Sequence, residues 1–231
     1  MAGAGPVPRL FSPGLALLPG LAVLQGAMFG AANAGVNDLA RADVGIAGLV
    51  WATLGLTSAV AGFVVTARPG PWQLPVRLRA ALSVQATLVL GLLLADGPLP
   101  AAIALAVLGS AVAPTLIALF GLAERVAPRE RMGEAMTLLG SGLIIGQGLA
   151  AVVSGQLARA HGYTASFGLA CTAAALALLL ALLFARPNRL ARPAALPGPP
   201  GSPASEPDAS APGMGQARRS SASAAAGPQR P

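Results

Sequence analysis

Charged residues are scarce in this sequence. They make up 10% of its 231 residues, whereas a soluble domain contains about a quarter. Lysine is absent, so all 15 basic residues are arginines, and cysteine and histidine occur once each. A single cysteine cannot form an intramolecular disulfide, and no cluster of residues suited to a metal ion is present. The composition therefore argues against a water-soluble protein and against a fold held by disulfides or metal.

Hydrophobic residues, in contrast, make up 55% of the chain and are gathered in long blocks. A helix needs about 20 consecutive apolar residues to cross a bilayer, and most of the blocks reach that length. The sequence thus predicts an all-α membrane protein with six transmembrane helices. The expected spans are residues 14–37, 44–66, 79–95, 98–122, 135–157 and 163–185, of which the third is short and is expected to include flanking residues.

The arginines predict the orientation of the spans. Ten of them flank the spans on one side, whereas Arg41 and Arg159 alone lie on the other. Arginine-rich short loops stay in the cytoplasm, so both termini are predicted to be cytoplasmic in a multi-pass protein of the cell membrane. This topology accounts for the net charge of +7, and we expect no nucleic-acid partner. A signal peptide around Arg9 is the alternative, but its removal would leave an odd number of spans.

The two ends of the chain differ from the middle. Residues 186–231 are rich in Pro, Ala, Ser and Gly and have few large apolar residues. Such a segment cannot bury enough apolar surface to offset its ordering entropy. We therefore predict a cytoplasmic segment over residues 1–13, a six-helix transmembrane domain over 14–185 and a disordered cytoplasmic tail over 186–231.

Small residues recur at helical spacing in several spans. Helices in lipid associate through close packing, which small side chains permit. The second span carries a small residue every three or four positions, and the fifth contains the run "GSGLIIGQGLAAVVSG". These faces predict tight helix packing or sliding contacts between helices during gating. The candidates are Gly48, Gly55, Gly62, Gly142, Gly146, Gly148 and Gly155.

Charged side chains are expected only at the ends of the spans. An ionisable group at mid-membrane is costly and usually marks an ion or proton pathway. Glu124 is a gating candidate, because it follows an apolar run and could pair with Arg125 or Arg131. Ser141 and His161 would lie at opposite faces of the membrane, which excludes a serine–histidine pair. We therefore expect no enzyme activity, no cofactor and no metal.

Residues 109–170 resemble spans ten to twelve of bacterial major facilitator superfamily transporters. The matching features are a Gly-Ser pair with Pro114 in one span, a charged loop ending in Glu134, Gln147 within a glycine-rich helix, and a short "ARAHG" turn. The first three spans resemble spans seven to nine, although the loop "VVTARPGPWQLPVRLR" lacks the family's Asp. The resemblance covers residues 14–186 and implies the C-terminal half of a drug or small-solute efflux protein, with two inverted three-helix repeats.

This resemblance implies which helices line a substrate cavity. Gln25, Phe29 and Asn33 share one face of the first span, which corresponds to the cavity-lining seventh helix. Ser110 and Thr115 flank Pro114 in the fourth span, where the proline can kink the helix and free carbonyl groups. Hydrogen bonding between helices is an equal alternative for Gln25 and Asn33.

A half-transporter needs a second half. We expect secondary transport of a small solute, by a homodimer or with a separately encoded N-terminal half. The alternative is a truncated or accessory six-span protein without transport activity of its own.

Overall fold

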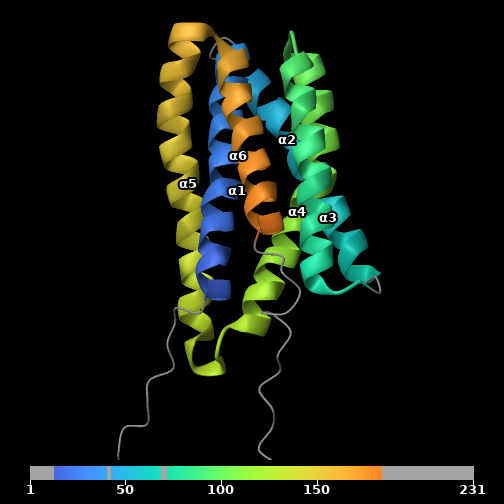
Figure 1. The fold of residues 1–231 in the computed structure, drawn as a ribbon. Helices are drawn as coiled ribbons and strands as arrows, with labels where there is room; N and C mark the ends of the chain where they lie inside the picture. The colour runs from blue at the N-terminus through green and yellow to red at the C-terminus, as the bar shows by residue number, and fades with distance from the viewer. Residues whose placement is uncertain (1–12, 41–42, 69–71, 184–231) are drawn as a thin grey trace, which may run out of the picture. The chain divides into compact units, whose positions relative to one another are not determined.

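The computed structural model describes residues 13–40, 43–68 and 72–183, all of which belong to one unit, Met1–Arg192. Six described helices are long and apolar enough to cross a membrane. They are α1 (Pro13–Leu39), α2 (Val44–Ala67), α3 (Leu74–Leu88), α4 (Pro98–Val126), α5 (Met132–His161) and α6 (Tyr163–Leu183) (Figure 1). Short 3₁₀ helices follow α3 at Val89–Leu94 and precede α5 at Arg129–Arg131.

The predicted all-α fold with six spans is confirmed. The third span begins at Leu74 and so includes residues before 79, as expected for the short block. The fourth and fifth helices are longer than predicted, because the helical conformation continues through polar residues beyond the apolar blocks, to Val126 in α4 and to His161 in α5. The predicted N-terminal segment and the predicted disordered tail lie outside the described residues, apart from Pro13.

Local signals in the sequence define the helix ends. The Asp43 side chain accepts a hydrogen bond from the Ile46 backbone N–H at 3.1 Å and so caps the first turn of α2. Pro98 begins α4, where its missing N–H costs nothing. Gly162 has φ 79° between α5 and α6, a left-handed conformation that glycine adopts without steric cost. This residue permits the sharp reversal from α5 to α6.

The helices form two groups, each centred on one helix, and the two groups have the same pattern of contacts. Helix α1 packs against α5 and α6, whereas α4 packs against α2 and α3. Exchanging α1 with α4, α2 with α5 and α3 with α6 converts one set of contacts into the other. Helices α1 and α4 run in opposite directions (Figure 1). This pattern is that of an inverted three-plus-three repeat.

Two apolar clusters fill the interior of the bundle. One, the Phe167 cluster, includes Met28, Leu105 and Phe167, and the other, the Leu119 cluster, includes Leu18 and Leu119. Both clusters draw side chains from α1, α3, α4, α5 and α6. The two clusters therefore follow one another along the helix axes.

Candidate functional site

Helices α1 and α5 meet through their backbones. A Cβ atom at Gly26 or Gly30 would clash with backbone carbonyl groups of α5, and one at Gly146 would clash with the Val23 carbonyl oxygen of α1. Gly142, one turn before Gly146, lies against the same helix, and its added Cβ would be 3.3 Å from the Pro19 carbonyl oxygen. Any side chain larger than hydrogen at Gly26, Gly30 or Gly146 would push these two helices apart.

Helices α2 and α4 make the contact that corresponds to the one between α1 and α5 when the two repeats are exchanged. A Cβ atom at Gly109 would clash with the Thr57 hydroxyl oxygen and would lie 2.5 Å from the Leu54 carbonyl oxygen. Gly62 lies nearer the other end of α2, where its added Cβ would be 3.2 Å from the Ala113 Cβ. The two repeats thus place a close glycine contact at corresponding positions.

Other predicted packing glycines face away from the bundle. An added Cβ at Gly48 or Gly55 on α2 would meet no atom within 4 Å, and the same holds for Gly148 and Gly155 on α5. Large apolar side chains lie around them, including Leu56, which is 69% exposed, and Val152, which is 67% exposed. Helices α2 and α5 therefore each present one face to the bundle and leave a small-residue face outside it.

The cavity candidates on α1 range from buried to half-exposed. Gln25 is 2% exposed, so its carboxamide lies inside the bundle, whereas Phe29 and Asn33 are half-buried. The Asn33 side-chain oxygen accepts a hydrogen bond from Asn37 Nδ2 at 2.8 Å. The shared face predicted from their spacing thus reaches from the interior toward the surface of the bundle.

The candidates on α4 lie on different sides of that helix. Ser110 is exposed and donates to the Val107 carbonyl at 2.7 Å, whereas Thr115 is 1% exposed and donates to the Ala111 carbonyl at 2.8 Å. Five residues in an α-helix turn it by about 140° beyond a full turn, which explains the difference. Pro114 lies half-buried within the helix, which continues through it.

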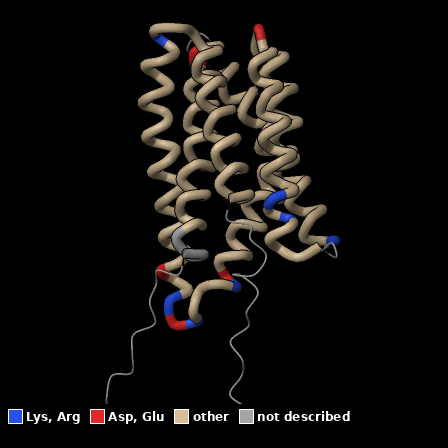
Figure 2. Tube along the Cα trace, viewed as in Figure 1, with Lys and Arg blue, Asp and Glu red and all other residues tan. Residues whose placement is uncertain are grey.

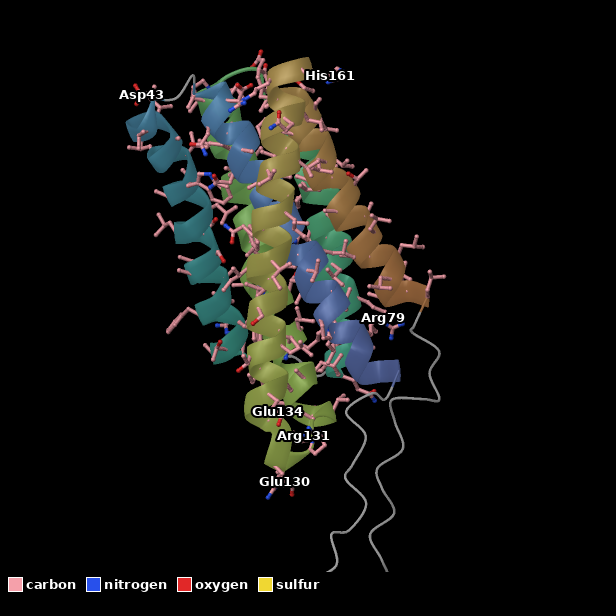
Figure 3. The ribbon with its side chains drawn as sticks, turned by 90° about the vertical axis from the view of Figure 1, so that its left-hand side faces the viewer. Asp43, Arg79, Glu130, Arg131, Glu134 and His161 are labelled. Carbon is pink, nitrogen blue, oxygen red and sulfur yellow. The ribbon has the colours of Figure 1, made fainter. Side chains whose placement is uncertain are left out.

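Charged residues lie at or near the two ends of the described helices (Figure 2). Asp43 and His161 mark one end, called here the Asp43 end, and Arg79, Glu130, Arg131 and Glu134 mark the other, called the Arg131 end (Figure 3). At the Arg131 end, Arg131 Nε forms an ion pair with Glu134 Oε2 at 3.1 Å. Glu124, near the end of α4, is exposed.

An apolar groove of about 270 Å³ runs between α2 and α4. It lies where both helices begin, at the Asp43 end, and none of the predicted cavity residues lines it. The groove offers apolar contact surface but almost no polar group. Its lining residues are Gly45, Ile46, Leu49, Val50, Thr53, Pro98, Leu99 and Ala102.

Some features of the structure were not anticipated from the sequence. The contact of Gly109 with α2 could have been predicted from the sequence, because Gly109 and Ala113 are four residues apart and form a small-residue pattern. The Trp51 indole Nε1 is buried without a hydrogen-bond partner. Nothing in the sequence around Trp51 indicates this, because it depends on how α2 crosses the bundle.

Six membrane-length helices, an inverted repeat and glycine contacts at corresponding positions define a polytopic membrane protein of the transporter class. The Major Facilitator Superfamily model matches residues 75–226, about two-thirds of the chain. The chain therefore belongs to the Major Facilitator Superfamily, a family of membrane transporters. The matched range includes nearly all of α3 and the whole of α4 to α6, and α1 and α2 precede it. No curated protein matches the chain.

Proposed function

We propose that this six-helix bundle is one half of a transporter that exports a small amphipathic solute by alternating access. The second six-helix bundle would come from another copy, from a separate chain or from further sequence of the same polypeptide. The solute would bind between the two bundles.

The open faces of α2 and α5 carry this proposal. Both helices are packed on one side through close contacts, at Gly62 in α2 and at Gly146 in α5. On another side both present glycines with no atom near them, at Gly55 and Gly148. Small residues on a transmembrane helix permit close approach of a further helix. Two such faces at equivalent positions of the two repeats suit a partner with the same internal repeat.

The half-exposed residues of α1 and α4 suit contact with a solute. Phe29 offers an aromatic surface, and Asn33 and Ser110 offer groups that form hydrogen bonds. Binding sites in transporters with internal repeats lie near the bilayer midplane, where the repeats meet. Gln25 and Thr115 are buried and would reach a solute only after α1 or α4 moves. Glu124, exposed at the Arg131 end, remains a candidate for the gate.

One observation favours the second candidate, an accessory protein that does not transport. Among the described residues, the charged ones lie at or near the helix ends (Figure 2). Proton-coupled transport requires a titratable group within the membrane. In the transport proposal, the second bundle supplies that group. In the accessory alternative, none is required, and the open faces bind another membrane protein.

The oligomeric state and the efflux of a probe together test the proposal. The full chain is purified in lipid nanodiscs and its mass is measured by native mass spectrometry. Ethidium, an amphipathic aromatic cation, is the probe for efflux from cells that express the chain. We expect a dimer or a complex with a second six-span chain, together with efflux above that of control cells. A monomer without efflux would favour the accessory function.

A substitution then localises the solute site. Asn33→Leu is expected to lower the efflux rate about tenfold, which corresponds to about 1.4 kcal/mol of lost interaction in the transition state. Gln73→Leu at the start of α3 is the matched control, because it removes an exposed carboxamide at the Arg131 end of the bundle, away from Asn33. Equal rates for the two variants would exclude Asn33 from the site.

A further inference from the structure

Three buried polar side chains lie at one level of the bundle. Gln25, Gln85 and Thr115 are 2%, 1% and 1% exposed, and each lies within three residues of the midpoint of its span. On α1 and α3 the glutamines separate the part that joins the Leu119 cluster from the part that joins the Phe167 cluster, and on α4 Thr115 lies near the point where the two clusters meet. A thin polar layer therefore lies between the two apolar clusters.

Two members of this layer have a polar atom without a partner. Gln25 Nε2 and Gln85 Oε1 are both buried and form no hydrogen bond. The first is a donor and the second an acceptor. An unsatisfied buried group is costly, so buried polar atoms nearly always have a partner in the protein or an ordered water. The two groups are complementary, which points to one shared partner.

The contacts of Gln85 place the two carboxamides near each other. Gln85 Nε2 donates to the Met28 sulfur at 2.9 Å, which brings the end of this side chain from α3 to α1. Met28 follows Gln25 by three residues, and residues three apart are neighbours on a helix surface. The Gln85 carboxamide thus lies over the part of α1 that carries Gln25.

We propose that one water molecule is bound between Gln25 and Gln85. Its oxygen accepts a hydrogen bond from Gln25 Nε2, and one of its hydrogens is donated to Gln85 Oε1. Buried waters in proteins typically make about three such bonds to groups that are otherwise unsatisfied. The site is neutral and has apolar clusters on both sides, so it suits water and disfavours an ion. This inference does not depend on the proposed transport function.

Water-edited solid-state NMR of the full chain in lipid bilayers tests the site. Glutamine and leucine are labelled with ¹⁵N and ¹³C. The Gln25, Gln85, Gln156 and Leu105 signals are assigned from their loss in the variants Gln25→Leu, Gln85→Leu, Gln156→Leu and Leu105→Ile. We expect water polarisation to reach the Gln25 side-chain amide as early as that of exposed Gln156, and earlier than the buried methyl groups of Leu105. Transfer no earlier than to Leu105 would overturn the proposal. So would a direct contact between Gln25 Nε2 and Gln85 Cδ.

Stability measurements test whether the two glutamines act as one unit. Unfolding in mixed detergent micelles is compared for Gln25→Leu, Gln85→Leu and the double variant. We expect each single change to raise the unfolding equilibrium constant about tenfold, and the double change to raise it by about the same factor, because neighbours that share a partner are not additive. Gln147→Leu, on an exposed face of α5, is the matched control and should have little effect.

Independent effects that multiply to about a hundredfold in the double variant would contradict a shared partner. Gln25→Met and Gln85→Met keep the side-chain length and serve where a leucine variant does not fold. The NMR measurement on the unaltered chain remains decisive in either case.

Discussion

At the scale of single residues, the atoms that lie opposite a glycine determine whether it contributes to helix packing. Gly146 and Gly148 are two positions apart on α5, and the sequence predicts the same packing or gating role for both. The structure places Gly146 against the Val23 carbonyl and Gly148 in open space. A small-residue pattern indicates that helices can approach, but it does not tell which of two adjacent faces is used within the bundle. That choice depends on the other helices, which the local pattern does not contain.

This difference gives the first prediction at this scale. Gly146→Ala forces α5 away from α1, and overpacking of this kind typically costs about 1–3 kcal/mol. Gly148→Ala meets no atom within 4 Å and should leave stability unchanged or slightly raised, since alanine favours helix. Unfolding in mixed micelles measures both. Equal stability of the two variants would mean that α1 and α5 are not in backbone contact.

At the scale of elements, the six spans could be predicted because length and hydropathy determine them. The third span is instructive: Arg77 lies within α3, although the apolar block predicted from the sequence begins at residue 79. Arginines near a helix end can extend their charged groups toward the membrane surface. The pairing of α1 with α5 and of α2 with α4 could not be obtained from any single helix; the family resemblance implied an inverted repeat but did not specify these pairs, which the structure shows.

The open helix faces give a prediction at this scale. Gly55→Leu on α2 and Gly148→Leu on α5 place bulk on the faces proposed to meet a second bundle. Both variants should fold, because no atom lies within 4 Å of either added Cβ, yet each should abolish the dimer or complex in native mass spectrometry. Ala175→Leu, at an exposed position of α6, is the matched control. Intact assembly in both glycine variants would place the interface elsewhere.

At the scale of the whole molecule, the two ends differ in charge. Six described arginines lie at or near the Arg131 end, whereas Arg159, in the last turn of α5, lies near the Asp43 end. This asymmetry was visible in the sequence, because it needs only the order of spans and loops. Burial of Gln25 and Thr115 was not visible, because a polar residue in a span can face a cavity, lipid or the bundle interior, and only the packing distinguishes these.

The charge asymmetry predicts that the Arg131 end lies in the cytoplasm. Single cysteines are introduced by Glu130→Cys or His161→Cys into a Cys171→Ala background. An impermeant maleimide should label the cysteine at position 161 in intact cells and the one at position 130 only after the membrane is opened. The reverse pattern would invert the topology.

The contact between α1 and α5 also constrains the order of assembly. The Ser154 hydroxyl of α5 donates to the Ala31 carbonyl of α1 at 3.2 Å, across 123 residues of sequence. During synthesis, α1 enters the membrane well before α5 has been made. Its glycines therefore contact lipid or the insertion machinery until α5 is present. Contacts between distant segments form slowly because loop closure precedes them. The tightest junction of this bundle is therefore among the last that the growing chain can complete.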